Sequence, residues 1–194
     1  MIPNIPHPVE TDPAPDIDWT CQAIAEYLRD GLNAAYVPAK IKSLQRQKER
    51  HLEYIQQGLA EPTTIFDNQI YELTHTQTPP KVVNGIRAYD AFNLPLHEFP
   101  YLKVYRSQDI YSAGKTVSQS SLMSTYCLSL PNQEELQGSM RWVSWTINNL
   151  LLNPQVNLCL KIQDGSVRAE YRTMLNEMVI PVYAFLRMYF TIKS

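Results

Sequence analysis

Cysteine and histidine are the residue types best suited to nucleophilic or metal chemistry, and in this sequence both are few and scattered. The 194 residues include three cysteines and four histidines. A zinc site usually draws Cys or His ligands from closely spaced pairs, and no two histidines here stand four residues apart or next to a cysteine. An odd number of separated cysteines also argues against a disulfide framework. We expect Cys21, Cys127 and Cys159 to be small buried residues, with no metal and no cofactor bound.

The sequence motifs of nucleotide-binding and hydrolytic enzymes are missing. Gly-x-Gly-x-x-Gly, Gly-x-Ser-x-Gly and His-Glu-x-x-His do not occur. Residues 112–116 read Ser-Ala-Gly-Lys-Thr, which imitates the end of a phosphate-binding loop. Where such a loop has its first glycine, this chain has Asp109, whose charge repels phosphate. We therefore expect a polar connecting loop at this place.

The remaining acidic pair is explained better by structure than by catalysis. Glu134 and Glu135 fall in the first turn of an expected helix, where carboxylates complement the helix dipole. The sequence therefore predicts a protein that is not an enzyme. Should an activity exist, Cys127, His97 and Asp109 are the first residues to test.

The segment of residues 1–15 contains five prolines, which exclude a helix or a central strand. It predicts an extended arm, and two interpretations stay open. The arm is either a disordered tail or a segment laid along a neighbouring subunit through Ile2, Ile5 and Val9.

Two helices are expected after the arm. Asp16 or Asp18 can cap the first, and Gly31 with Asn33 would end it. The second is expected from Pro38 to about Gly58. Its basic face, residues 40–50, is expected to be solvated or to contact an acidic partner, with a phosphate backbone as the other option.

The next forty residues carry only weak signals. Short strands are possible at residues 65–66 and 70–73, and Asn84-Gly85 is typical of a hairpin turn. A stretch of this length without strong elements is usually functional or becomes ordered against a partner. We interpret residues 61–98 as an irregular insertion.

The last hundred residues predict the main body of the fold. Alternating apolar residues indicate strands at 101–106, 122–130, 156–162 and 182–192, with a polar stretch at 107–121 and a tight turn at Asp164-Gly165. Residues 167–179 fit a helix or a strand. A helix between Pro131 and Pro154 has one apolar stripe. The expected fold class is α+β, a mixed and mostly antiparallel sheet packed with one long amphipathic helix. Residues 16–194 would form a single domain.

In this order of elements the chain resembles the tail-terminator (tail-completion or neck) proteins of tailed phages. The resemblance rests on the strand at 99–106, which begins Phe99-Pro100 and ends at Arg106, on the long polar loop after it, on the helix through Trp142 and Trp145, and on the closing strands at 167–171 and 189–192. It covers residues 95–194 well and the first sixty residues loosely. The proline-rich arm and the insertion depart from the pattern.

The resemblance implies a structural virion subunit that forms a homo-oligomeric ring, with a hexamer as the expected size. Such a ring closes the tail tube and contacts the head connector, and DNA passes through its lumen without sequence-specific binding, which fits the net charge of −2. The implied location is the virion neck, assembled in the host cytoplasm without membrane contact, since no signal peptide or apolar span is evident. Tyrosine-rich surfaces are typical of subunit contacts. The interface candidates are Tyr101, Tyr105, Arg106, Tyr111, Lys115, Tyr183, Arg187 and Tyr189.

Two other functions remain open at this stage. One is another neck or head-completion connector protein, which would share these physical features. The other is a soluble adaptor domain that binds a peptide or protein by adding a strand to a sheet edge.

Overall fold

The computed structural model describes residues 18–57, 64–87, 100–111, 117–130, 133–152, 161–163, 165–174 and 182–193. The chain divides into two compact units, one made of residues 1–32 and 83–194 and the other of Asn33–Val82. The arm of residues 1–15 and most of the strand expected at 156–162 lie outside the described residues.

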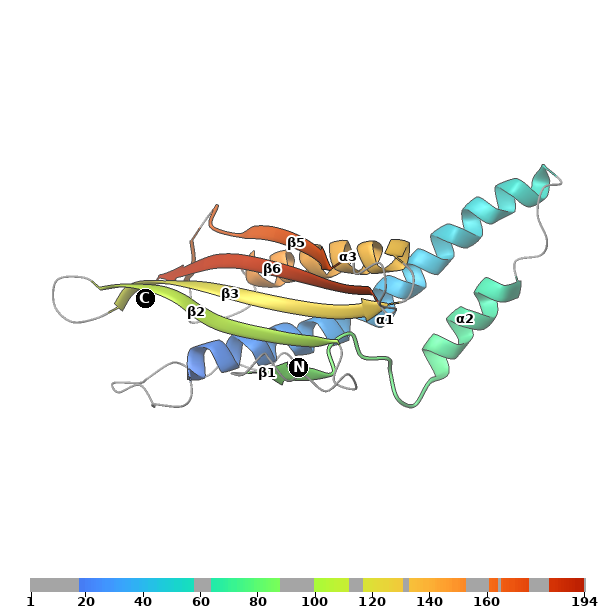
Figure 1. Ribbon diagram of the computed structural model, residues 1–194. Coiled ribbons are helices and arrows are strands. Elements are labelled where there is room, and N and C mark those ends of the chain that lie inside the picture. Colours follow the sequence, from blue (N-terminus) through green and yellow to red (C-terminus); the bar gives the residue numbers. More distant parts are fainter. Residues whose placement is uncertain are drawn as a thin grey trace. The chain divides into compact units, whose positions relative to one another are not determined.

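The first unit is built on a six-stranded sheet (Figure 1). Its strands are β1 (Gly85–Arg87), β2 (Tyr101–Tyr111), β3 (Val117–Leu130), β4 (Lys161–Ile162), β5 (Arg168–Met174) and β6 (Val182–Lys193). The order is β1-β2-β3-β6-β4, and β5 also pairs with β6. Only β1 and β2 run parallel among these pairs, so the sheet is mixed and mostly antiparallel.

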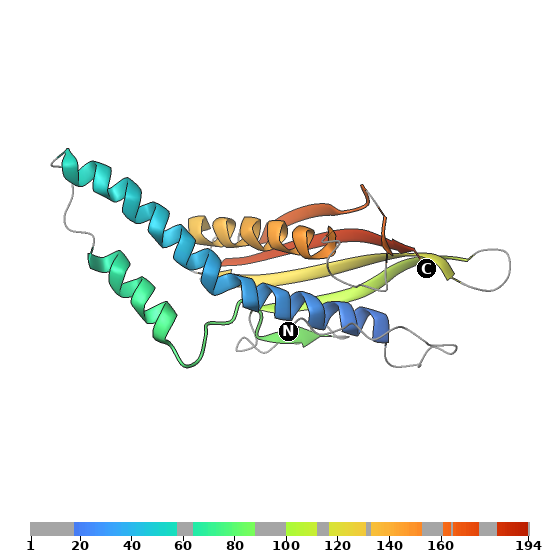
Figure 2. The same ribbon diagram turned by 180° about the vertical axis from the view of Figure 1, so that it is seen from behind.

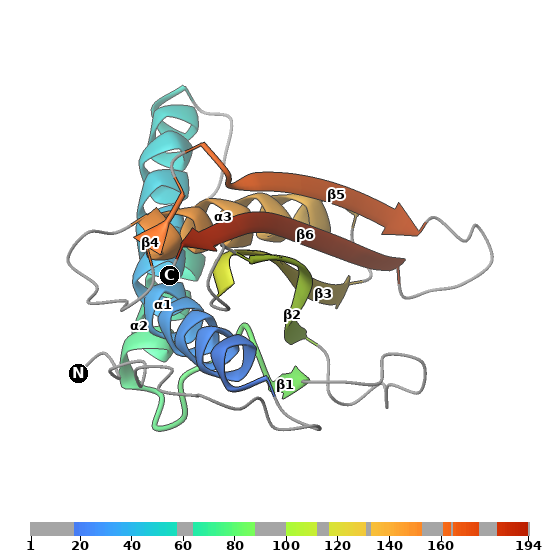
Figure 3. The ribbon, with the colours of Figure 1, turned by 90° about the vertical axis from the view of Figure 1, so that its left-hand side faces the viewer.

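Two helices cover one face of this sheet. They are α3 (Gln133–Leu152) and the first part of α1 (Trp19–Gln56), and both lie in front of the strands in Figure 2. Viewed from its end in Figure 3, the sheet curls around the side on which these helices lie. The α+β class is therefore confirmed, with the correction that α1 shares the packing against the sheet with α3.

The core lies between these helices and the sheet, and the apolar periodicity of each element explains it. Along β6 every second side chain is buried, including Leu186, Met188 and Phe190, while α3 contributes a stripe at intervals of three and four residues. Burying each such side chain contributes about 1.5–3 kcal/mol. The stripe predicted for α3 is confirmed by the buried residues Leu136, Met140, Val143, Ile147 and Leu151.

The two helices expected between residues 16 and 59 form one continuous helix, so the predicted break was wrong. Gly31 does not end a helix but lets α3 approach closely, because a Cβ atom there would meet the Leu150 side chain at 2.7 Å. Asn33 accepts a hydrogen bond from the Val82 amide at 2.8 Å. Both residues serve tertiary contacts, and the exposed Pro38 is accommodated inside the helix.

The second unit consists of the later part of α1 and α2 (Thr64–His75), joined to Val82 by an extended chain. The strands considered at 65–66 and 70–73 were wrong, since Phe66, Ile70 and Leu73 instead follow a helical spacing and are the half-buried residues of α2. Lys48 on α1 pairs with Asp67 on α2 at 2.6 Å. One lysine of the predicted basic face therefore serves the contact between these two helices.

Two connections in the first unit also differ from expectation. Asn84-Gly85 does not form a hairpin turn, because the Asn84 amide donates to the Pro100 carbonyl and Gly85 begins a strand parallel to β2. The polar stretch expected at 107–121 is mostly strand, with residues 112–116 outside the described part. Polar side chains are accommodated there by pairing across the strands, as when the Ser107 hydroxyl donates to the Ser121 carbonyl.

The end of the chain follows the alternation well. Residues 168–174, which fitted a helix or a strand, form β5 against β6. The tight turn before β5 is confirmed by the positive φ of Gly165, 71°, and by a hydrogen bond from the Ser166 amide to the Gln163 carbonyl. Strand β6 is central, with β3 on one side and β4 and β5 on the other.

Candidate interaction surface

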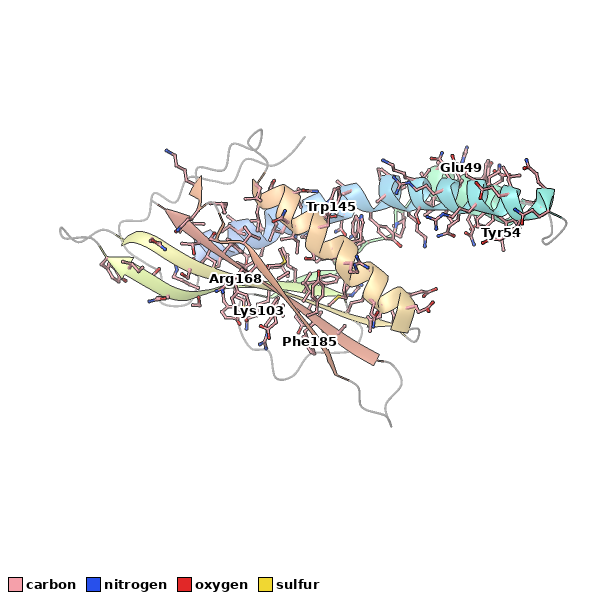
Figure 4. All side chains as sticks on the ribbon, turned by 90° about the horizontal axis from the view of Figure 1, so that it is seen from above. Glu49, Tyr54, Lys103, Trp145, Arg168 and Phe185 are labelled. Carbon is pink, nitrogen blue, oxygen red and sulfur yellow. The ribbon has the colours of Figure 1, made fainter. Side chains whose placement is uncertain are left out.

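The face of the sheet that turns away from α1 and α3 is the main candidate site, and we call it the open face. Strand register defines it, because residues paired across antiparallel strands point to the same side. Figure 4 shows Lys103 and Phe185 on the side away from α3. Among the described side chains of the open face are Tyr101, Lys103, Tyr105, Met123, Thr125, Cys127, Arg168, Glu170, Phe185, Arg187 and Tyr189.

Aromatic side chains occupy the open face in two rows that cross the strands. In one row Tyr105 and Tyr189 flank Met123, and the Tyr105 hydroxyl donates to the methionine sulfur at 3.3 Å. In the second aromatic row, four residues away along the strands, Tyr101 and Phe185 flank Cys127. Tyr105, Phe185 and Tyr189 keep part of their surface accessible, whereas Tyr101 is buried. Accessible tyrosine of this kind is enriched at protein interfaces.

The open face is also mainly cationic. Three of its charged side chains are Lys103, Arg168 and Arg187. Glu170 is the one carboxylate among the described side chains of this face, and it accepts a hydrogen bond from Tyr189 at 2.9 Å. The Lys103 ammonium lies 5.3 Å from the centre of the Tyr105 ring, a cation–π geometry.

Arg187 is distinctive because its Nε atom is buried and finds no acceptor among the described residues. A buried donor without a partner costs about 1–3 kcal/mol. The guanidinium sits between the two aromatic rows, opposite Thr125 on β3 and Glu170 on β5.

Arg106, in contrast, points to the helix side of the sheet. Its guanidinium donates to Asp18 at 2.8 Å, to Asp109 at 3.0 Å and to the Ser120 hydroxyl at 2.6 Å. Asp18 also caps α1 by accepting from the Cys21 amide at 3.0 Å. Burial acts to raise the pKa of Asp18, but the hydrogen bonds from Arg106 and Cys21 outweigh it, so that the pKa lies below its ordinary value.

The described cysteines do not have the properties of nucleophiles. Burial raises the pKa of the Cys127 thiol to about 12, with a smaller opposing effect from a hydrogen bond to Tyr101. Burial, and then the charge of Asp18, raise the pKa of Cys21 as well. A thiol of this kind stays protonated near neutral pH, and the thiolate is the reactive form. Within the described ranges, no three Cys, His, Asp or Glu side chains gather in a way that could hold a metal ion.

A groove between α3 and β5 was not anticipated from the sequence. This groove encloses about 320 Å³ and is lined by Leu136, Met140, Arg141, Tyr171, Ala184 and their neighbours. Tyr171 keeps 50% of its surface exposed. The signal in the sequence was weak, because residues 167–179 fitted two kinds of element.

The predicted interface residues fall into three groups. Tyr101, Tyr105, Arg187 and Tyr189 come together on the open face. Tyr111 is 66% exposed at the end of β2, whereas Arg106 is engaged by Asp18 and Asp109 within the chain. Lys115 and the side chain of Tyr183 lie outside the described residues, as do His97 and the phosphate-loop imitation at 112–116.

No family model matches this chain, and no curated protein matches it. None of the helices in the described ranges is long and apolar enough to cross a membrane.

Proposed function

We propose that this chain is a structural assembly subunit that associates with its own copies into a ring. The observation that carries the proposal is the open face, which combines accessible aromatic rings with cationic side chains on a rigid sheet. Buried tyrosine and arginine anchors supply most of the binding energy at protein interfaces. The outer surface of a curled sheet (Figure 3) suits a protein partner better than a small substrate, which binds in a concave pocket.

Charge on the open face favours a head-to-tail contact over a symmetric pair. Two open faces packed against each other would bring Lys103, Arg168 and Arg187 of both copies together, and like charges at an interface are costly. The open face therefore needs a chemically different partner surface. When that surface belongs to the next copy, the contact is heterologous and can close into a ring.

The specific role that we propose is the tail terminator of a tailed phage, at the head–tail junction. In that role the ring ends the tail tube and docks it to the connector, with a hexamer as the expected size. The support is the element order, in which an N-terminal helix, a long strand pair, an amphipathic helix and closing strands follow one another. Another neck or head-completion role uses the same surfaces.

The groove between α3 and β5 favours a second candidate function, that of an adaptor domain. No described strand pairs with the outer edge of β5, and an extended peptide could add to this edge while its side chains enter the groove. In that case we expect a stable one-to-one complex with a cellular protein.

Electron microscopy with purified tail tubes separates these candidates. The tail tubes are those of the phage that the proposal implies as the source of the chain. We expect the protein to bind at one end of each tube and to stop its growth, and an Arg187→Glu variant to bind less. Protein that stays free in the presence of tube ends would contradict the tail-terminator role.

A further inference from the structure

We infer that the open face of one copy binds the proline-rich residues 1–17 of a neighbouring copy. The inference rests on the proposed function, because it requires a neighbouring copy. It commits to one occupant for the open face and gives residues 1–17 a role in assembly.

The distance between the two rings of an aromatic row sets the repeat that an occupant must match. Tyr105 on β2 and Tyr189 on β6 are in register across β3. Two strand spacings separate them, about 9.5 Å. Tyr101 and Phe185 are in the same register four residue pairs along the strands, where Tyr101 is buried and Phe185 is partly accessible. A ligand that crosses the strands along the Tyr105–Tyr189 row can therefore contact both accessible rings with apolar groups about 9.5 Å apart.

Residues 2–10 have a matching period. Their sequence is Ile-Pro-Asn-Ile-Pro-His-Pro-Val-Glu. Proline-rich chains favour the polyproline II helix, with three residues and about 9.3 Å per turn. In that conformation Ile2, Ile5 and Pro8 form one side and Pro3, Pro6 and Val9 a second. The third side carries Asn4, His7 and Glu10. Two apolar sides thus repeat at about the distance between Tyr105 and Tyr189, and docking of such helices on aromatic surfaces is an established recognition mode.

The charges of the two surfaces are opposite. Residues 1–17 contain Glu10, Asp12 and Asp16 and no lysine or arginine. The open face presents Lys103, Arg168 and Arg187. Attraction between the two surfaces favours residues 1–17 as the occupant over most other segments of the chain. Their carboxylates also offer acceptors near the Arg187 guanidinium, whose Nε atom lacks an acceptor among the described residues.

The place where these residues join α1 favours a neighbouring copy over the same copy. Asp18 is held by Arg106 on the helix side of the sheet, opposite the open face. Pro13 and Pro15 precede it in the sequence, and proline-rich segments favour the extended polyproline II conformation. Seventeen residues in this conformation span about 50 Å, which is enough to cross to another subunit.

Photo-crosslinking in the full-length chain tests the inference. A tagged copy carrying a photoreactive phenylalanine analogue at Ile5 is produced together with an untagged copy. We expect a tagged–untagged product whose linked peptides map to β2 or β6 of the untagged copy. Lys103→Glu with Arg187→Glu in the untagged copy should reduce this product about tenfold or more. Arg141→Glu, an exposed change on α3, is the matched control and should leave it unchanged, with thermal unfolding measured for each variant.

The other outcomes overturn the inference. Linkage of Ile5 to its own open face only would assign the occupant to the same copy. Linkage that responds to Arg141→Glu instead would place residues 1–17 in the groove beside β5, and no linkage to either surface would reject binding of these residues. The mass of the same sample by light scattering keeps the two proposals apart. Rings without linkage to the open face contradict this inference alone, whereas a monomer contradicts the proposed function as well.

Discussion

Replacing Asp18 by alanine should destabilise the first unit more than any other single carboxylate change among the described residues. Asp18 performs two functions at once, since it caps α1 through the Cys21 amide and holds the Arg106 guanidinium. Its side chain is only 18% exposed. Loss of a cap costs about 1 kcal/mol, and loss of a hydrogen bond to a charged group about 1.5–3 kcal/mol. We expect Asp18→Ala to lower the free energy of unfolding by about 2–4 kcal/mol.

Urea denaturation followed by circular dichroism measures this change at pH 7. Asp18→Asn keeps an acceptor for the cap and loses the charge, so it should cost about 1–2 kcal/mol. Asp30→Ala is the matched control, because the Asp30–Arg29 pair is more exposed and such pairs contribute about 0–1 kcal/mol. An Asp18→Ala variant within about 0.5 kcal/mol of wild type would refute the reasoning, since the cap alone exceeds that value.

The pH dependence gives an independent check of the same contact. The pKa of Asp18 is lower in the folded chain than in the unfolded one, where it is about 3.9. The stabilisation is therefore fully present above the unfolded-state pKa and is lost as the pH falls through the lower folded-state pKa. Between pH 5 and acid unfolding, the difference in stability between wild type and Asp18→Asn should shrink. A difference that grows toward acid pH would contradict the assignment.

Three further predictions concern the core, the approach of the helices and the thiols. Met188→Asp places a charge at a position only 2% exposed and should lower the free energy of unfolding by more than about 4 kcal/mol. The variant should therefore be insoluble, or unfolded by circular dichroism. A folded variant would mean that β6 is misplaced. Gly31→Val should cost about 1–3 kcal/mol by overpacking against Leu150, and less in a Leu150→Ala background; equal costs in urea titrations would exclude the contact. With its pKa at about 12, the Cys127 thiol should resist iodoacetamide at pH 8 until the chain unfolds. Mass spectrometry of the labelled peptides measures this reaction. Rapid labelling of the folded chain would count against the burial of Cys127.

The sequence indicated the core of the first unit because its periodicities are strong. Alternation gives β6 one apolar side, and the three-and-four spacing gives α3 one apolar stripe. Folding buries these two apolar surfaces against each other. The alternate residues of β6, Phe185, Arg187 and Tyr189, lie on the opposite side, which is the open face.

The errors occurred where a residue has a local preference that a tertiary contact overrides. Gly31 and Asn33 resemble helix-ending residues, yet one makes room for Leu150 and the other accepts a hydrogen bond from Val82. The contact of Arg106 with Asp18 was also not predicted, because only the fold brings Asp18 to it from 88 positions away. Local patterns contain no information about such distant partners, so the ion pair and the groove beside β5 could not be predicted.

The mass of the purified chain in solution tests the central claim most directly. Light scattering across a concentration series, with negative-stain images of the same samples, should reveal a closed ring, six copies being the expected number. An Arg187→Glu variant that remains folded should shift the distribution toward smaller species. A chain that stays monomeric at high concentration, and does not assemble on tail tubes, would contradict the account of this protein as a ring-forming subunit.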